Sequence, residues 1–505
     1  MNQVRPAYNP DNQLLSVLIY NLDASRLRAC LEAIVSQSVV GAYEIIYIDD
    51  ASTDGAWEVA LDFSQQHDGI ISLNRNRFAA GPDYCKSMAL RMSKGTHYLL
   101  VNQELPPLPE ILEKCRQLLI HDESAQCRSA GAIDNRLRYL AGTGQVSDVD
   151  SPVALGDGPL VSICIFNYNY GRYLKCCLDS VFAQTYGNIE VCFSDNASSD
   201  DSWAIALDYL NRYPGRMAVV RNRKNFGSDT NFANCFAHIR GKYFVELCSD
   251  DALMPEFVST CVKVLDAHPE AGYVMVHRTI IDEHDQRTEE PPFYNQSCVI
   301  SGPEQAAVYM MAAVNPCISQ IMYHTKRTYG KSVIGGIASR WYGTRLHDFN
   351  LCCEFSMAYI KEPLLLHRLH SQNDSFRASE TLIEIIGPYV LQYQYADISS
   401  HYPHMTKVAE RLKPSINKLA TLSLRYCVRL LNSGKETSAL RYYHLAAAIN
   451  PEILVDRVFM ALSRCWAATA DEKAKIIASL GAEDNLATRT VSYDPPPGSI
   501  PVELS

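Results

Sequence analysis

The sequence predicts an α/β protein made of two related segments followed by a helical region. Three observations support this fold class. Residues 14–109 resemble residues 160–255, which forms an internal repeat. Within each copy, short apolar runs alternate with amphipathic helical stretches, a pattern typical of right-handed βαβ units and a mainly parallel sheet. From about Thr381 to Leu480, Leu, Ala and Tyr follow helical spacing and few glycines interrupt them.

The repeat keeps its register over a long stretch. Asp49 matches Asp195, Arg77 matches Arg223, and Pro109 matches Pro255, so the offset is constant from Asp49 onward. Chance does not produce such a register. Each copy is therefore expected to fold as strand, helix, strand, acidic turn, helix, short strand, helix and strand.

The end of the second copy carries the most informative stretch. An apolar run from Tyr243 to Leu247 stops at two adjacent carboxylates, Asp250 and Asp251. In an open α/β sheet, ligands bind beyond the carboxyl ends of the strands. Neighbouring carboxylates suit a hard divalent cation that bridges to phosphate oxygens, whereas the alternative is a solvated turn that caps the next helix. The stretch by itself fits either a divalent-cation site, with Mn²⁺ or Mg²⁺ as the expected ion for a diphosphate-bearing substrate, or such a capping turn.

The first copy differs from the second where chemistry is expected. Its last strand is followed by Asn102-Gln103-Glu104-Leu105, which leaves one acid in place of two. A lone Glu is a poor site for a divalent metal. The first copy is therefore predicted to be truncated and inactive.

Composition narrows the class of protein. The 505 residues are 47% hydrophobic and 20% charged, which is ordinary for a globular protein with several domains. The net charge of -10 argues against nucleic-acid binding. The 17 scattered cysteines are expected to be reduced core residues. The start of the chain lacks an apolar leader and no apolar run reaches about 18 residues, so we expect a cytoplasmic protein, at most peripheral to the inner face of the membrane.

Five ordered motifs in residues 159–376 resemble the family 2 glycosyltransferases of the GT-A fold. They are a turn after the first strand, a C-L-x-S-x-x-x-Q-T-Y helix, a D-D-x-S-x-D turn, an N-x-G-x-x-x-N-F stretch, and a G-K-Y-F strand with its acidic loop. In this sequence they are Asn167-Tyr168-Asn169, Cys177 to Tyr186, Asp195 to Asp200, Asn225 to Phe232, and Gly241 to Asp251.

The resemblance implies tandem GT-A (Rossmann-like) domains, the first truncated, followed by an all-helical C-terminal region. It also implies transfer of a sugar from a nucleotide-sugar donor, with inversion at the anomeric carbon, to a glycan, lipid-linked or protein acceptor. The expected donor-binding residues are Asn167, Tyr168, Asn169, Asp195, Asn196, Asn225, Gly227, Asn231, Ser249 and Arg368. The expected metal ligands are Asp250, Asp251 and His370. Cys248 stands where many members have the first Asp of D-x-D.

The catalytic base of the family is an acid in an E-D-like pair with an R-x-H segment downstream. Here the pair is His347-Asp348, and Arg368-Leu369-His370 follows. Asp348 is therefore expected to deprotonate the acceptor hydroxyl. His347 and Trp341 are expected at the acceptor, although Trp341 fits a core role equally well.

Two other functions remain open from the sequence. One is a bifunctional polymerase in which both copies are active. The other is a non-catalytic nucleotide-sugar-binding scaffold, in which the first copy, with its retained Asp49 to Asp54 turn, and the helical region dock partners. In either case the helical region offers a surface for a peripheral membrane or partner-protein contact.

The expected domain boundaries follow from these patterns. They are a truncated GT-A-like domain at 1–120, a linker at 121–157, a catalytic domain at 158–380, a helical domain at 381–482 and a disordered tail at 483–505.

Overall fold

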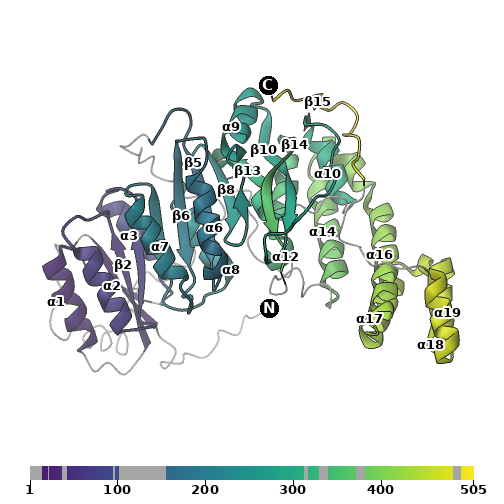
Figure 1. The fold of residues 1–505 in the computed structure, drawn as a ribbon, viewed down its shortest axis with the longest axis horizontal. Coiled ribbons are helices and arrows are strands. Elements are labelled where there is room, and N and C mark those ends of the chain that lie inside the picture. The colour runs from purple at the N-terminus through teal and green to yellow at the C-terminus, as the bar shows by residue number, and fades with distance from the viewer. Residues whose placement is uncertain are drawn as a thin grey trace, which may run out of the picture. The chain divides into compact units, whose positions relative to one another are not determined.

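The computed structural model describes residues 14–20, 22–36, 42–94, 97–101, 155–311, 317–328, 339–370, 381–480 and 491–504 (Figure 1). The chain forms two compact units, Met1–Asp250 and Asp251–Ser505. The first unit holds both copies of the repeat. The expected boundary at 120/121 and most of the linker lie outside the described residues, as do Asn102-Gln103-Glu104-Leu105.

The two copies in the first unit contain the same elements in the same order. The first copy has β1 (Leu14–Tyr20), α1 (Ala24–Val35), β2 (Ala42–Asp49), α2 (Ala56–Gln66), β3 (Ile71–Arg75), α3 (Pro82–Met92) and β4 (His97–Val101). The second has β5 (Val161–Asn167), α6 (Gly171–Phe182), β6 (Ile189–Asp195), α7 (Ser202–Arg212), β7 (Met217–Arg221), α8 (Ser228–Phe236) and β8 (Tyr243–Cys248).

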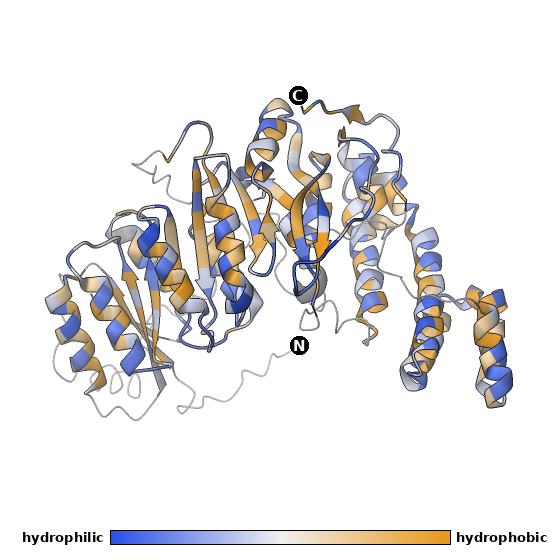
Figure 2. Cartoon of the chain, in the orientation of Figure 1, coloured by the Kyte–Doolittle hydropathy of each residue, from blue (hydrophilic) through white to orange (hydrophobic). Residues whose placement is uncertain are grey.

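Each copy builds a parallel sheet with the same strand order. Strands β4-β1-β2-β3 are neighbours in the first copy, and β8-β5-β6-β7 are neighbours in the second. Strands β5 and β6 are buried along nearly their whole length, as expected for parallel strands covered on both faces. In Figure 2 the strands are largely hydrophobic and the helices carry hydrophilic stripes.

The two sheets join edge to edge through β3 and β7, which pair antiparallel. Leu73 pairs with Arg221, Asn74 with Val220, and Arg75 with Val219. Because Leu73 and Arg75 match Val219 and Arg221 in the repeat, these pairs are related by a local pseudo-two-fold axis through Asn74 and Val220. The join therefore has the isologous form of a symmetric dimer interface within one chain.

Two buried ion pairs repeat this symmetry across the join. Arg77 Nε lies 2.9 Å from Glu190 Oε2, and Arg223 Nε lies 2.8 Å from Glu44 Oε2. Each glutamate also accepts a hydrogen bond from a serine of the neighbouring strand of its own copy, Ser162 for Glu190 and Ser16 for Glu44. The charges of both glutamates are thus compensated by the opposite copy.

Matching residues of the two copies adopt the same positive-φ backbone after β2 and β6 and again before α3 and α8. Ala51 and Ala197 adopt a left-handed backbone with φ of 57° and 61°. Gly81 and Gly227, with φ near 89° and 87°, precede α3 and α8. That conformation is cheap for glycine and costly for residues with a Cβ. The matching backbone in both copies shows that these glycines set the start of the third helix.

The second unit contains a sheet and a helical region. Its strands are β9 (Ala252–Leu253), β10 (Ala271–Ile281), β11 (Arg287–Thr288), β12 (Cys298–Ile300), β13 (Ile321–His324), β14 (Ser356–Arg368) and β15 (Ile500–Pro501). Neighbours run β15-β12-β14-β10-β13, with β11 on β10 and β9 on β14. Its other elements before residue 380 are α9 (Phe257–Ala267), α10 (Gly302–Met310), the short 3-10 helix η2 (Ile318–Gln320), α11 (Thr325–Thr328) and α12 (Ser339–Cys352).

The helical region follows as the sequence predicts. It comprises α14 (Ile383–Ser400), η3 (Pro403–Met405), α15 (Thr406–Ala409), α16 (Leu412–Asn432), α17 (Glu436–Ile449), η4 (Pro451–Val455), α18 (Arg457–Ala467) and α19 (Ala470–Leu480). A core of its own includes Leu424, Tyr442 and Leu462. Among the described helices, none is long and apolar enough to cross a membrane.

The last described residues, 491–504, differ from the disorder expected for 483–505. Strand β15 pairs antiparallel with β12, and the Tyr493 ring lies 5.3 Å from that of Phe293. Composition gave no sign of this order, because the free edge of β12 that β15 covers exists only in the folded unit.

Candidate active site

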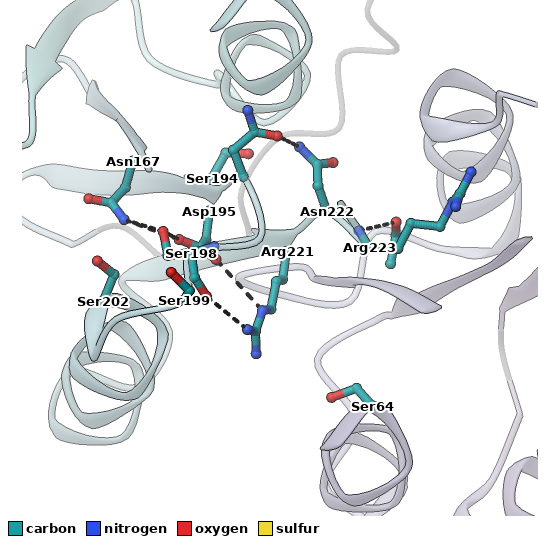
Figure 3. Close-up of polar contacts among 12 residues, drawn as sticks. Ser64, Asn167, Ser194, Asp195, Ser198, Ser199, Ser202, Arg221, Asn222 and Arg223 are labelled. Atoms are coloured by element: carbon teal, nitrogen blue, oxygen red, sulfur yellow. Dashed lines mark hydrogen bonds and ion pairs between the residues drawn. The ribbon is translucent and has the colours of Figure 1, made fainter. Parts of the chain in front are cut away.

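The turn after β6 is built around the carboxylate of Asp195. This carboxylate accepts hydrogen bonds from Asn167 Nδ2 at 3.1 Å and from the hydroxyl and backbone N–H of Ser198 (Figure 3). The Arg221 guanidinium lies 3.6 Å away. Burial raises the pKa of Asp195, and the hydrogen bonds from Ser198 and Asn167 offset this only in part. The predicted residues Asn167 and Asp195 are therefore brought together at the carboxyl ends of adjacent strands.

Hydrogen bonds join the turn after β5 to the turn after β6. The backbone N–H of Asn169 donates to Ser198 Oγ, and Asn169 Oδ1 accepts from the Ser199 N–H at 2.8 Å. Asn169 has a left-handed backbone, with φ of 59°. The Tyr168 side chain is 44% exposed, so its ring is available for stacking.

Three other predicted donor-binding residues form a network that shapes the loop before α8. Asn196 Nδ2 donates to Asn225 Oδ1 at 2.8 Å and to the Gly227 carbonyl, while Asn196 Oδ1 accepts from the Phe226 N–H. In the first copy, Asp50 replaces Asn196 and binds the N–H groups of Ala80 and Gly81. The side chain at this position therefore holds the loop in both copies.

Asn231 and Ser249 also contact the strands from which the site is built. Asn231 Oδ1 accepts from Ser194 Oγ at 2.6 Å, and its Nδ2 donates to the Asn167 carbonyl. Ser249 Oγ donates to the Phe166 carbonyl at 3.4 Å. Both residues are buried, and these hydrogen bonds position β5, β6 and the acidic loop.

The acidic loop gathers three groups that could bind a cation. Ligand atoms of Cys248, Asp250 and Asp251 lie within 4.8 Å of one another. A Mg²⁺-type ion commonly uses one or two protein carboxylates together with substrate phosphates. Asp250 is 8% exposed, and as a carboxylate it fits that requirement.

Asp251 is the first residue of the second unit, and its carboxylate is hydrogen-bonded within that unit. Its carboxylate accepts hydrogen bonds from Ser319 Oγ at 2.6 Å and from the Arg368 N–H at 2.9 Å, and it lies 3.0 Å from His367 Nδ1. Burial raises the pKa of Asp251, but His367 and these donors outweigh burial and hold that pKa below its usual value. Burial lowers the pKa of His367, whereas Cys317 and Asp251 raise it to about 10.

Arg368 is buried and paired with a nearby loop. Its guanidinium donates to the Asp282 carbonyl at 2.7 Å and lies 2.7 Å from Asp285 Oδ1. These contacts fix the end of β14 beside β10. His370, two residues further, is 8% exposed.

Asp348 on α12 has the environment of a general base. It is fully buried, and its Oδ1 accepts a hydrogen bond from the Tyr323 hydroxyl at 2.7 Å. Among the described residues, Oδ2 has no hydrogen-bond partner. Burial raises the pKa of Asp348 to about 7, although Tyr323 and Arg345 oppose the rise. A carboxylate with a pKa near the working pH suits proton abstraction.

Tyr323 contacts both residues of the His347-Asp348 pair. The His347 ring lies edge-on to the Tyr323 ring, with centroids 5.3 Å apart. His347 is buried beside this ring. Trp341 is the third residue of α12, and its side chain lies outside the described part of the structure.

Sequence reasoning missed Tyr323, Ser319, Cys317 and His367. The first three lie in the Asn315 to His324 stretch, where polar residues alternate around η2 and β13 without matching a motif. Their partners, Asp348 and Asp251, are distant in sequence. For Tyr323, the alternation of side chains along β13 is the one sequence signal that indicates on which face of the strand it lies.

The turn of the first copy repeats the geometry around Asp195. Ser52 Oγ donates to Asp49, and Arg75 Nε lies 3.4 Å from that carboxylate. Arg75 also lies over the Trp57 ring at 5.3 Å, as Arg221 does over Trp203. Burial raises the pKa of Asp49, as it does for Asp195. The retained sequence therefore maintains the same turn.

A family model for glycosyl transferase family 2 matches residues 16–141 and 162–314, more than half of the chain. The chain belongs to glycosyl transferase family 2. The family prediction is confirmed, and the two matched segments together with the observed topology confirm the predicted fold class of tandem α/β domains with a helical C-terminal region. Each matched segment covers one copy of the repeat.

Curated relatives match shorter stretches of this family 2 chain. Chondroitin synthase of Escherichia coli is 36% identical over 104 residues, 21% of this chain and 15% of that protein. Hyaluronan synthase of Pasteurella multocida is 38% identical over 109 residues, 21% of this chain and 11% of that protein. The chain spans less than half of the length of these relatives.

Solved structures to which the chain shows some similarity include a crystal structure of S. aureus TarS 1-349 in complex with UDP-GlcNAc. It is 14% identical to this family 2 chain with a TM-score of 0.42, and the match covers 63% of this chain and 88% of that one. The mannosyltransferase PcManGT from Pyrobaculum calidifontis, solved with GDP-Man and Mn²⁺, is 16% identical with a TM-score of 0.37, covering 70% of this chain and 95% of that one.

Proposed function

We propose that this protein is an inverting glycosyltransferase that moves a sugar from a nucleoside-diphosphate donor to a hydroxyl of a glycan acceptor. Membership of glycosyl transferase family 2 supports the reaction class. The relatives named chondroitin synthase and hyaluronan synthase favour a polysaccharide acceptor over a lipid-linked or protein one. The observation that carries the mechanism is the buried Asp348 with one oxygen unpaired among the described residues and a pKa of about 7.

The donor's nucleoside is assigned to the turns after β5 and β6. Tyr168 is exposed at this place and offers a ring for the base, while Asn167 and Asp195 supply polar groups for the base and ribose. The network of Asn196, Asn225 and Gly227 keeps the adjoining loop in shape. In this proposal the buried asparagines act chiefly by positioning.

The diphosphate is assigned to the acidic loop. Asp250 would hold a divalent cation there, and such a cation offsets the charge that grows on the departing diphosphate. Asp251 would support this loop through its hydrogen bonds to Ser319 and Arg368.

Asp348 would accept the proton of the attacking hydroxyl. Tyr323 holds Oδ1, so Oδ2 is the oxygen left to receive the proton. As the O–H bond breaks, the acceptor oxygen forms a bond to the anomeric carbon from the side opposite the diphosphate, and the sugar–phosphate bond breaks. Inversion at that carbon follows from this direction of attack.

The test is a screen of UDP- and GDP-sugars with oligosaccharide acceptors, in Mn²⁺ or Mg²⁺, measuring nucleoside diphosphate release and product mass. Asp348→Asn is expected to abolish transfer while donor binding, measured by calorimetry, stays within a few-fold. Asp397→Asn, an exposed acid on α14, serves as the matched control. Full turnover by Asp348→Asn would overturn the base assignment.

A chelator tests the cation separately. Its addition is expected to abolish transfer, and Mn²⁺ is expected to restore it in the wild type but not in Asp250→Asn. Transfer that continues in the chelator would remove the metal from the mechanism.

A further inference from the structure

Three side chains of types that commonly bind metals lie close together inside the second unit. The proposed function assigns no ligand to this cluster. Asp251, Cys317 and His367 each offer one ligand atom, and these atoms lie within 4.8 Å of one another. They come from the acidic loop, the residue that precedes η2, and β14. Because these segments are far apart in sequence, the fold itself creates the cluster.

One distance in the cluster is close to the spacing of two ligands around a small tetrahedral ion. Asp251 Oδ1 lies 3.0 Å from His367 Nδ1. Tetrahedral zinc, with Zn–N and Zn–O bonds of about 2.0–2.2 Å, places two such ligand atoms about 3.3 Å apart. The ligands would need to separate by only a few tenths of an ångström to admit the ion.

Neighbouring groups orient two of the three ligands. Ser319 Oγ donates to Asp251 Oδ2 at 2.6 Å, and the Arg368 N–H donates to Oδ1. The Cys317 side chain accepts the backbone N–H of Gln320. Supporting hydrogen bonds of this kind hold ligands in place at protein metal sites. Asp251 is buried while Cys317 and His367 are partly exposed, which leaves a way in for an ion.

We propose that Asp251, Cys317 and His367 bind a zinc ion, with water as the fourth ligand. A thiolate and an imidazole favour zinc over Mg²⁺ or Mn²⁺, which prefer oxygen ligands. The site is separate from the cation assigned to Asp250 and does not depend on the proposed transfer reaction. The ion ties the acidic loop to η2 and β14, and thereby fixes the backbone next to Asp250.

The test uses the full chain, stripped of metal and titrated with Co²⁺ as a spectroscopic substitute for zinc. One equivalent of Co²⁺ is expected to produce a thiolate-to-cobalt absorption band, and one equivalent of Zn²⁺ to remove it. Cys317→Ser is expected to lose the band. Cys176→Ser, which changes an exposed cysteine outside the cluster, is the matched control and is expected to keep it. Absence of the band in the wild type, or its persistence in Cys317→Ser, would overturn the proposal.

A second measurement needs no variant and so does not depend on the folding of one. X-ray absorption at the zinc edge of the loaded wild type is expected to show one sulfur at about 2.3 Å among nitrogen and oxygen ligands. A shell of nitrogen and oxygen alone would overturn the site.

Two further variants locate the ion. Ser319→Ala is expected to weaken zinc binding about 10- to 100-fold, and an unchanged affinity would count against the proposed orientation of Asp251. Asp250→Asn is expected to keep the cobalt band. Loss of the band in that variant would place the ion in the acidic loop and contradict the assignment.

Discussion

Asp348 is the residue on which the proposed mechanism depends most directly. Its pKa of about 7 means that the base is half-protonated near neutral pH. We expect kcat/KM to rise with pH through about 7 and then level off, because only the carboxylate accepts a proton. A pH profile of the transfer reaction tests this. A rate that does not change between pH 5.5 and 8 would contradict it.

The hydroxyl of Tyr323 lowers the pKa of Asp348. Its hydrogen bond to Oδ1 lowers the pKa of Asp348, so Tyr323→Phe is expected to raise that pKa and move the midpoint of the pH profile upward. The measurement is the same profile at saturating donor. Tyr359→Phe, which removes another buried tyrosine hydroxyl of the second unit, is the matched control. A midpoint that stays in place would show that Tyr323 has only a packing role.

The same carboxyl makes stability depend on pH. The pKa of Asp348 is higher in the folded chain than its ordinary value of 3.8, so the folded state binds the proton more tightly. Stability from this group is present below pH 4 and is lost as pH rises from about 4 to 7. At roughly 1.4 kcal/mol per pKa unit, the loss is about 4 kcal/mol. Asp348→Asn is therefore expected to raise the melting temperature at pH 8 and much less at pH 5, measured by calorimetry. An equal change at both pH values would contradict this.

At the scale of elements, the join between β3 and β7 depends on two buried charge pairs. Arg77 and Glu190 are 4% and 3% exposed, so Glu190→Gln leaves a buried guanidinium uncompensated. Removal of one partner of such a pair costs roughly 3–5 kcal/mol. Glu44→Gln is expected to cost less, because Arg223 is 12% exposed and can reach water.

Urea unfolding of the full chain, followed by tryptophan fluorescence, measures these losses. Asp208→Asn, which breaks the exposed pair with Arg212, is the control and is expected to cost at most about 1 kcal/mol. If Glu190→Gln cost no more than this control, the symmetric ion pairs would not hold the two copies together.

At the scale of the whole molecule, the two copies are expected to differ in donor binding. Both copies keep the same turn of Asp, Ser and Arg. Only the second copy has two adjacent aspartates after its last strand, because the first has Asn102-Gln103-Glu104-Leu105 there. We expect one donor to bind per chain by calorimetry. Asp195→Asn should weaken binding at least tenfold, and Asp49→Asn should leave it unchanged. Two donors per chain, with one lost in each variant, would favour the bifunctional polymerase instead.

The sequence by itself determined the local elements and their order. Alternating apolar runs predicted the strands of both copies, and β8 ends at the acidic loop as expected. These features depend on neighbouring residues in the chain, so periodicity and turn residues are sufficient to predict them.

Only the tertiary structure decided which distant groups meet. Tyr323 donates a hydrogen bond to Asp348, and Asp251 contacts Ser319 and His367. Arg77 pairs with Glu190 across the join of the two copies. All of these contacts link residues that are far apart in sequence. A motif can assign an aspartate to a site but not its pKa, because burial and partners set the cost of its charge. The same holds for Asp251: chain order does not reveal that its carboxylate meets Ser319 and His367, because η2 and β14 approach it only in the folded unit.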